Sequence, residues 1–584
     1  MPHRTPPQVP RQAIDRRRRG ADHRHANAAH PRKPGATARP PAEARSDFVG
    51  KQSVETDIIV VGSGSAGSAL AGRLSEDPRL RVTILEAGAL DRNPWLHIPI
   101  GYAKTMYHPT ISWNYQTEAE GELNGRSVPW PRGRVLGGSS AINGLIYIRG
   151  QAEDYDHWRQ LGCTGWSFED CLPYFKRAES NQHGENELHG GGGPLHVSDL
   201  RDRNPLSHAF LQAAIELGFP RNEDFNGPKQ EGAGWYQTTT RNGMRCSAAT
   251  AYLKPALKRG GNLRLVTGAQ VLRILVEEGR ATGVVYRDAS GEHTLRATRE
   301  VVLSGGAINT PQVLMLSGIG PAAHLQSMGI EVKRDHPHVG QHLQDHFQAR
   351  LMYRASQRVT LNERVNSLLG MAMMGAQYAM TRAGPLSFAA GTSGLFARVL
   401  PQSATPDVQY HFIPWSADTV KEGLHRFPGF TISACQLRPE SRGEITLASP
   451  DPMAKPRIAA RYLSTETDRQ CMVEGLKLGQ RLAASSAMRP FIEAPYAPAP
   501  GKGETDAELL EYCRATGGTI YHPTSTCRMG SDDNAVVDTE LRIRGVERLR
   551  IADCSIMPTV PSGNTNAGAI MIGERCAEFI RRAA

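Results

Sequence analysis

The stretch Asp57-Ile-Ile-Val-Val61 runs directly into Gly62-Ser-Gly64-Ser-Ala-Gly67, and it decides the fold of this chain. Its β-branched residues predict a buried parallel strand, and the apolar residues at 68–74 predict a helix after the glycines. A second apolar run, Arg81-Val-Thr-Ile-Leu85, predicts another buried strand that ends at Glu86. Strand, glycine loop, helix, strand and acid follow in the order of a βαβ unit that binds a nucleotide.

The three glycines and Glu86 each have a physical function in such a unit. Gly62 permits the tight turn, Gly64 allows the backbone to approach a pyrophosphate, and Gly67 allows helix and strand to pack closely. The helix N-terminus supplies unpaired N–H groups and positive dipole to the phosphates. A carboxylate at Glu86 accepts hydrogen bonds from a ribose 2′-OH and disfavours a 2′-phosphate. The unit therefore predicts FAD or NAD, without separating the two.

Three later segments resemble signatures of the glucose–methanol–choline oxidoreductase family. They are Gly133-Arg-Val-Leu-Gly-Gly-Ser-Ser-Ala-Ile-Asn143 with its continuation to Gly150, Gly306-Ala-Ile-Asn-Thr-Pro-Gln-Val-Leu-Met-Leu-Ser-Gly-Ile-Gly320, and Tyr521-His-Pro-Thr-Ser-Thr-Cys-Arg-Met-Gly530 followed by Ile551–Asp553 and Pro561–Asn566. The resemblance covers the chain from about Val54 to the C-terminus. Within the family, the chain looks most similar to bacterial FAD-dependent dehydrogenases of aliphatic alcohols, and next to choline dehydrogenases.

The resemblance implies two interleaved domains. An α/β FAD-binding Rossmann-like domain is expected to comprise residues 54–195, 245–330 and 510–584, and an α+β substrate domain on an antiparallel sheet residues 196–244 and 331–509. The length of 584 residues also favours two closely associated domains. Phe430–Leu437 and Gly443–Ala448 alternate like strands of a half-exposed antiparallel sheet with helices behind it.

The resemblance also implies which residues contact FAD: Gly62, Gly64, Ser65, Ala66, Gly67, Glu86, Arg132, Gly137, Gly138, Ser139, Asn143, Gly144, Val271, Asp553, Asn564 and Asn566. Considered alone, Gly137-Gly138 followed by two serines offers backbone N–H groups to a flavin or phosphate, although a plain glycine-rich turn is the alternative. Some relatives attach FAD covalently through a histidine near the Gly-Gly pair. Trp130 occupies that position here, so we expect non-covalent FAD.

Oxidation of an alcohol requires a base that removes the hydroxyl proton while hydride leaves the carbon for flavin N5. Histidine titrates near neutrality, and His522 matches the family's catalytic histidine. The second family position falls on Asn564, which is expected to orient the substrate oxygen. Asn566 is the rival for that function and is otherwise expected to support the flavin.

Other histidines and the cysteines are interpreted as structural. His342 and His346 have the i, i+4 spacing of helical metal ligands, but no third ligand is indicated, and no metal site is predicted. His183 and His189 fall in or beside the glycine-rich segment 184–193, which is expected to be a surface loop. Nine cysteines without a C-x-x-C pair are typical of reduced thiols in the cytoplasm.

The formal charge of +10 does not indicate a nucleic-acid partner. Residues 1–50 hold eleven Lys and Arg against four acids, so most of the excess lies in a segment that we expect to be a disordered tail. Its twin arginines lack the apolar region of an export signal. Val365–Thr381 is too short and too polar to span a membrane. We interpret it as a core or pocket helix in a cytoplasmic protein, with peripheral contact to the inner membrane as the alternative.

The leading hypothesis is a dehydrogenase of primary aliphatic alcohols that passes electrons to a quinone or another carrier. An oxidase that uses O₂, a choline-specific enzyme, and a hydroxynitrile lyase with a structural flavin are the alternatives. Asn222–Gly234 and the methionines at 371, 373 and 374 are candidates to line the substrate entrance, although a methionine cluster is more often core. The sequence leaves the oligomeric state open.

Overall fold

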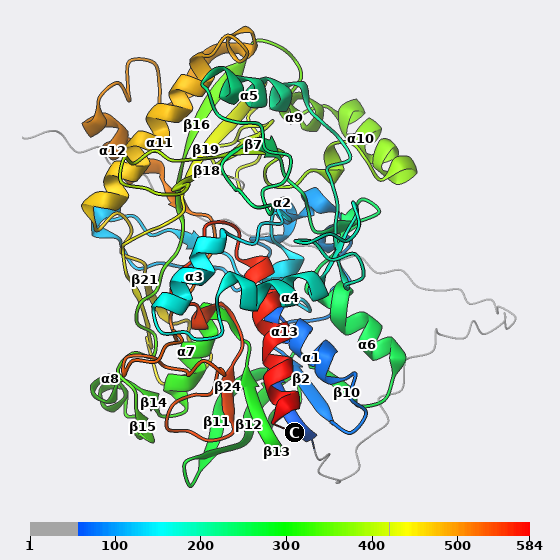
Figure 1. Cartoon of the computed structure of the whole chain (residues 1–584), viewed down its shortest axis with the longest axis vertical. Helices are drawn as coiled ribbons and strands as arrows, with labels where there is room; N and C mark the ends of the chain where they lie inside the picture. The colour runs from blue at the N-terminus through cyan, green and yellow to red at the C-terminus, as the bar shows by residue number, and fades with distance from the viewer. Residues whose placement is uncertain (1–55, 420, 584) are drawn as a thin grey trace, which may run out of the picture. The chain divides into compact units, whose positions relative to one another are not determined.

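The computed structural model describes residues 56–419 and 421–583, which belong to one compact unit, Ser53–Ala584. The predicted disordered tail at 1–50 lies outside the described residues. Two large sheets organise the unit (Figure 1).

The first sheet is built around the strand that the glycine loop follows. Five strands lie parallel in the order β10 (Leu263–Thr267), β2 (Val82–Glu86), β1 (Thr56–Val61), β13 (Gly291–Leu303) and β24 (Leu549–Ile551). All six residues of β1 are buried, because it lies between β2 and β13: Ile59 faces Thr83 on one side and Val301 on the other. The unbroken β-branched run is explained by this central position.

The long strand β13 (Gly291–Leu303) pairs with its neighbours in both parallel and antiparallel directions. Its second half pairs in parallel with β1 and β24, and its first half pairs antiparallel with β12 (Arg280–Asp288), which in turn pairs with β11 (Gln270–Glu277). The parallel sheet is thereby extended by an antiparallel hairpin. The carboxyl ends of β1, β2, β13 and β24 remain at one edge, where ligands bind in open α/β sheets.

The C-terminal helix completes the nucleotide-binding side of this sheet. Helix α13 (Asn566–Arg582) packs along α1 (Ser65–Leu74), as Figure 1 shows with α13 in red. Gly573 makes the close approach possible, since a Cβ there would lie 2.3 Å from the carbonyl oxygen of Ala66. The buried carboxylate of Glu574 accepts hydrogen bonds from Arg73 and Arg177, and these two arginines also pair with Glu76 and Glu578.

The second sheet is antiparallel, in the order β22 (Ile492–Ala497), β16 (Phe347–Ala355), β19 (Gly429–Gln436), β18 (Val408–Ile413), β17 (Ser393–Ala397) and β7 (Gly232–Trp235). β23 (Gly518–Thr519) also pairs with β16, although it lies within the range 510–584 expected for the other domain. Helix α11 (Glu466–Ala484) covers one face, where Gly475 and Gly479 lie against the strands. The exact domain ranges stay a prediction.

Two details of this sheet differ from the sequence-based expectation. β19 is buried along its whole length rather than half-exposed. Helix α11 covers one face of the strand, and other parts of the unit cover the opposite face. The segment 443–448 forms β20 (Glu444–Thr446), which pairs only with β21 (Arg457–Ala459) in a separate two-stranded sheet. Alternation alone does not reveal whether a second layer covers the polar face.

The remaining elements connect the two sheets or cover them. The helices are α2 (Tyr102–Thr105), α3 (Ala152–Gln160), α4 (Phe168–Ala178), α5 (Pro205–Glu216), α6 (Lys254–Arg259), α7 (Gly306–Leu316), α8 (Ala322–Ser327), α9 (Leu361–Val365), α10 (Leu368–Thr381) and α12 (Asp506–Thr516), and the short strands are β3 (Tyr115–Gln116), β4 (Pro129–Trp130), β5 (Glu179–Asn181), β6 (Leu195–Val197), β8 (Thr240–Arg241), β9 (Met244–Arg245), β14 (Ile319–Gly320) and β15 (Arg334–Asp335). Within the described part of the chain, none of the helices has the length and apolarity to cross a membrane.

Helix α10 contradicts the interpretation of Val365–Thr381 as a core or pocket helix. Only Met374 and Tyr378 of this helix are buried, whereas Leu368 is 84% and Met380 79% exposed. Figure 1 shows α10 at the periphery of the second sheet's side. Met371 and Met373 are exposed as well, so the proposed lining by methionines is wrong.

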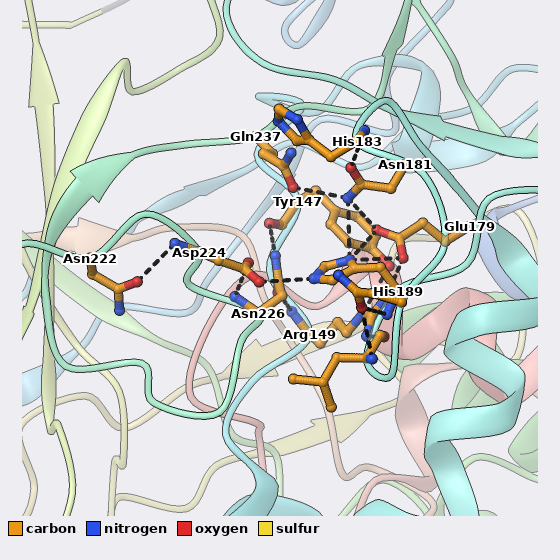
Figure 2. A network of polar contacts seen from close by, with 12 residues as sticks. Tyr147, Arg149, Glu179, Asn181, His183, His189, Asn222, Asp224, Asn226 and Gln237 are labelled. Carbon is orange, nitrogen blue, oxygen red and sulfur yellow. Dashed lines mark hydrogen bonds and ion pairs between the residues drawn. The ribbon is translucent and has the colours of Figure 1, made fainter.

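A buried polar network holds the loops next to the first signature (Figure 2). Glu179 accepts hydrogen bonds from Arg149 at 2.5 Å and pairs with His189 at 3.0 Å, and the other ring nitrogen of His189 lies 2.9 Å from Asp224. Asn226 connects the same loop to the backbone of Arg149. The segment 222–234 is thus tied into this network, and none of its residues lines the cavities described below, contrary to the expectation for the substrate entrance.

Candidate active site

The glycine loop has the close contacts that its sequence predicts. Gly62 adopts φ +103°, and a Cβ there would lie 2.5 Å from the carbonyl oxygen of Ser304. A Cβ at Gly67 would lie 2.0 Å from the carbonyl oxygen of Gly62, so only glycine permits this packing. Gly64 caps α1 without a side-chain hydrogen bond, which leaves the first N–H groups of the helix for an anion.

Glu86 lies at the end of β2, beside the same loop. Its carboxylate accepts hydrogen bonds from the backbone and the hydroxyl of Ser63, at 3.0 and 2.6 Å, and from the backbone of Gly88 at 2.8 Å. Burial raises the pKa of Glu86, and these three donors oppose the rise. The carboxylate lines the adjoining cavity, where its remaining lone pairs face a ligand.

Two cavities meet in front of the loop. The first, of about 150 Å³, runs along the carboxyl ends of β1, β2 and β13, and the second, of about 210 Å³, lies between the loop and the antiparallel sheet. The residues that line both are Ser65, Arg132, Ser139, Cys554 and Ala569. A long two-armed ligand can therefore place one arm in each cavity.

Fourteen of the sixteen residues expected to contact FAD line one or both cavities. The first holds Gly62, Gly64, Ser65, Ala66, Glu86, Arg132, Gly138, Ser139, Val271 and Asp553, and the second adds Asn143, Gly144, Asn564 and Asn566. Gly67 serves the packing of α1, and the backbone N–H of Gly137 donates to the Ser63 hydroxyl at 3.3 Å. Trp130 is buried against Tyr462 and lines neither cavity.

The second cavity contains the histidine and the asparagine of the catalytic hypothesis. His522 Nε2 lies 3.3 Å from Asn564 Nδ2, and both residues line the cavity. Asn566 begins α13, and its Oδ1 accepts a hydrogen bond from Ser65 at 2.7 Å. Asn564 is thus beside the imidazole and Asn566 beside the glycine loop, the arrangement that the preferred assignment requires.

A second histidine determines the tautomer of the first. His346 Nε2 lies 2.9 Å from the carbonyl oxygen of Leu437, which can only accept, so Nε2 of His346 carries the proton. His346 Nδ1, left without a proton in the neutral ring, faces His522 Nδ1 at 3.0 Å. His522 therefore donates from Nδ1, and its Nε2 lone pair faces Asn564 and the cavity.

Both imidazoles are held in the neutral form. Burial lowers the pKa of His346 to about 4. Burial, the neighbouring His346 and His411, and Arg132 hold the pKa of His522 well below 6.5. Asp345 holds the backbone of His522, because its carboxylate accepts from the backbone N–H of His522 at 2.6 Å and from the hydroxyls of Tyr462 and Thr519.

Sequence reasoning missed three of these groups. His342 lies in a bend with φ +64° and His346 directly precedes β16, so the two do not share a helix as the i, i+4 spacing assumed. His346 belongs to the candidate site. His411 on β18 also lines the cavity, with both ring nitrogens buried and without a hydrogen-bond partner among the described residues. Gln409, on the same strand, reaches the Oδ1 of Asn564 at 3.5 Å. No local sequence pattern points to His346, His411 or Gln409, because these residues meet only in the folded structure.

The residues present fit FAD. The buried carboxylate, the uncapped helix and the two joined cavities match its ribose, pyrophosphate and flavin ring in that order along the site. The site and the sheet therefore define a flavin-dependent oxidoreductase.

The comparisons with known proteins agree with this class. The N-terminal and C-terminal GMC oxidoreductase family models match residues 56–348 and 439–573. The chain is 42% identical over 529 residues to an oxygen-dependent choline dehydrogenase of Brucella anthropi and over 530 residues to an alcohol dehydrogenase [acceptor] of Pseudomonas putida, covering 90% of this chain and 96% of each relative. The chain belongs to the GMC oxidoreductase family, and its cofactor is FAD.

Solved structures share the fold. A pyridoxine 4-oxidase from Mesorbium loti superposes with a TM-score of 0.82 at 29% identity, covering 90% of this chain and 99% of that one. A formate oxidase superposes with a TM-score of 0.84 at 26% identity, covering 91% and 98%. The predicted fold class, a Rossmann-like FAD-binding domain interleaved with an α+β domain on an antiparallel sheet, is confirmed.

Proposed function

We propose that the chain oxidises a primary aliphatic alcohol to the aldehyde, with His522 as the base and Asn564 as the group that orients the substrate oxygen. The observation that carries the proposal is the unprotonated Nε2 of His522, which faces the cavity beside Asn564 while Nδ1 is engaged by His346. FAD, when bound, supplies the acceptor for the hydride.

Each residue of the site has a separate function in the proposed reaction. His522 accepts the hydroxyl proton at Nε2, and the Nδ2 group of Asn564 donates to the oxygen as its negative charge develops. His346 holds the imidazole at Nδ1, and Asp345 holds the backbone N–H of the same residue. The cavity walls include Met106, Ile142 and Trp415, and these apolar groups suit an alkyl chain.

Anaerobic mixing with alcohols tests the reaction directly. We expect primary aliphatic alcohols to bleach the flavin absorbance of the purified protein, and a His522→Ala protein with bound FAD to retain its colour for much longer. A flavin that keeps its absorbance with every alcohol would contradict the proposal and would favour a lyase with a structural flavin. Choline is the second candidate substrate, favoured by the name of the Brucella relatives.

We propose that a quinone or another carrier accepts the electrons, as the term acceptor in the name of the Pseudomonas relative suggests. The name of the Brucella relative instead points to O₂. Peroxide release separates the two. We expect little peroxide in air and rapid turnover with a soluble quinone, whereas one equivalent of peroxide per aldehyde would indicate an oxidase.

Helix α10 supports a peripheral membrane location for this cytoplasmic enzyme. Leu368, Leu369, Met373 and Met380 present apolar side chains to solvent, and the helix contains no acidic residue. Exposed arginines flank both ends, at 364 and 382, and match an anionic lipid surface. The buried Met374 packs in the same cluster as Trp415, which lines the substrate cavity.

Vesicle binding tests this location. We expect the holoenzyme to sediment with vesicles of anionic phospholipid and a Leu369→Gln, Met380→Gln double variant to remain in the supernatant. Met453→Gln, at a residue that is 46% exposed elsewhere, is the matched control and should sediment like the parent. Equal sedimentation of the parent and the double variant would contradict the proposal.

A further inference from the structure

The substrate cavity has an unbalanced charge. Two guanidinium groups, Arg132 and Arg350, are among its lining residues, and no aspartate or glutamate is. The three histidines nearest the reaction centre, His346, His411 and His522, all have lowered pKa values and contribute no positive charge at neutral pH. The charged groups of the cavity wall are therefore exclusively cationic.

The two arginines differ in their partners. The Nη1 of Arg132 donates to the carbonyl oxygen of Tyr521 at 2.7 Å, which fixes this side chain beside the region shared by the two cavities. Among the described residues, the guanidinium of Arg350 has neither a hydrogen-bond acceptor nor a carboxylate partner. The nitrogens of this partly buried guanidinium are not among the buried unsatisfied atoms, so its five donors are accessible to a ligand that enters the cavity.

The position of Arg350 on β16 places it along the substrate path. Residues 346, 348 and 350 alternate onto one face: His346 contacts the base, and Gln348 and Arg350 line the cavity. The amide of Gln348 is satisfied by Ser433 and by the carbonyl oxygen of Thr519. With about 3.3 Å per residue, the Cα of Arg350 lies roughly 13 Å along the strand from that of His346.

We propose that Arg350 binds a carboxylate at the far end of the substrate, so that the preferred substrates are primary alcohols that carry a carboxylate, that is, terminal hydroxy acids. The inference rests on the proposed function. The hydroxyl proton passes to His522, the carbon loses its hydride to the bound cofactor, and the product is the corresponding oxo acid. The carboxylate remains bound to the guanidinium, an ion pair that can form two parallel hydrogen bonds.

The same charges disfavour a quaternary ammonium substrate. A cationic alcohol in this cavity meets Arg350 and Arg132 and finds no carboxylate among the lining residues. The inference therefore predicts that choline is a poor substrate, in spite of the similarity to enzymes named as choline dehydrogenases.

The test compares the holoenzyme with an Arg350→Gln variant on three matched substrates of equal chain length: a terminal hydroxy acid, its methyl ester and the corresponding neutral alcohol. For the hydroxy acid, we expect the variant to raise KM roughly tenfold to a hundredfold with little change in kcat, the loss typical of a hydrogen-bonded charge pair. The ester and the neutral alcohol should respond little. Arg350→Lys should recover part of the loss.

A neighbouring arginine provides the control. Arg354 lies four residues further along β16, packs over the ring of Phe427 and does not line the cavity. Arg354→Gln should leave the preference for the hydroxy acid intact. A binding measurement complements the kinetics: a fatty acid that lacks the hydroxyl should perturb the flavin spectrum of the parent and bind at least tenfold more weakly to the Arg350→Gln variant.

Two results would overturn the inference. One is a parent enzyme that shows equal kcat/KM for the hydroxy acid and its ester, and the other is an Arg350→Gln variant that loses activity on all three substrates alike. In both cases the parent enzyme still oxidises the neutral alcohol and its flavin is bleached, so the proposed function stands. If no alcohol of either kind bleaches it, the proposed function fails first.

Discussion

The Nδ1 atoms of His346 and His522 lie 3.0 Å apart, and the two ring planes meet at 84°. Two neutral imidazoles can share one proton between these atoms, and the carbonyl oxygen of Leu437 decides on which ring it resides. The proton is on His522, so the nitrogen that faces the substrate cavity is the unprotonated one. The backbone carbonyl of Leu437 therefore fixes, through His346, the tautomer of His522 that the proposed base requires.

Replacement of His346 tests this relationship. His346→Ala should lower kcat by roughly tenfold, about the rate equivalent of one hydrogen bond, with FAD content unchanged. It should also move the acidic limb of kcat/KM to higher pH, because the neighbouring ring lowers the pKa of His522. His346→Gln, whose amide oxygen can accept from Nδ1, should restore part of the rate. An alanine variant with the parent's rate and pH profile would show that the contact has no function.

Removal of the base itself should cost much more. His522→Ala is expected to lower kcat toward the upper end of the usual range of roughly 10²–10⁴-fold for a lost general base, with FAD retained. Single-turnover bleaching of the flavin measures the effect on the chemical step. His183→Ala, an exposed histidine that pairs only with Asp199, is the control and should turn over normally. Normal turnover by an FAD-loaded His522→Ala protein would refute the assignment.

The activity should persist into acid. If His522 is the base, as proposed, its unprotonated form is the active one. The value of kcat/KM should then be maximal above the pKa of His522 and fall as the pH drops through that pKa. Burial and the neighbouring His346, His411 and Arg132 hold that pKa well below 6.5. We therefore expect a plateau of kcat/KM that continues below pH 6.5, measured with a substrate whose own ionisation lies outside the range. A limb centred at or above pH 6.5 would exclude His522 in its described environment as the base.

We expect the binding of FAD to depend on Glu86 and on no covalent bond. Glu86→Ala removes an acceptor from Ser63 and from the expected ribose, so the Kd for FAD should rise roughly tenfold to a hundredfold in equilibrium dialysis. Denaturation of the parent should release yellow FAD into the supernatant, because Trp130 stands where some relatives have the attaching histidine. Flavin that stays on the precipitated protein would contradict the second expectation.

The network of Figure 2 should make folding stability depend on alkaline pH. Burial lowers the pKa of His189, but hydrogen bonds to Asp224 and Glu179 outweigh it and raise the pKa to about 9. Because the folded pKa exceeds the unfolded value, this stabilisation is complete below pH 6.5 and is lost as the pH rises through 9. The Tm of the parent should fall between pH 6.5 and pH 9, and this fall should be smaller in the His189→Gln variant. An equal fall in the variant would show that other groups cause the pH dependence.

Much of the nucleotide-binding half could be predicted because its determinants are local. The strand at 57–61, the helix after it and the strand that ends at Glu86 were all predicted within a few residues of their observed bounds. Steric contact of Gly62 and Gly67 with nearby backbone leaves no choice of residue there. The positions of His522 and Asn564 followed from the resemblance to a family rather than from periodicity.

The expectations that failed concern contacts between distant segments. Alternation in β19 suggested one exposed face, but α11 and the rest of the unit cover both. The apolar sequence of α10 suggested burial, but the helix lies at the periphery with most of its apolar side chains exposed. A hydrophobic pattern states which residues favour burial, and only the packing of other elements decides which of them achieve it.

The amino-acid sequence by itself determined the parallel sheet, the glycine loop and the acid at Glu86, because sterics and hydrophobic runs act over a few residues. Only the tertiary structure decided that His346, 176 residues before His522, sets its tautomer. The same is true of Arg350, whose guanidinium reaches the cavity without a partner among the described residues. Both depend on how β16 lies against the C-terminal segment, and the pairing of segments so far apart leaves no local pattern in the chain.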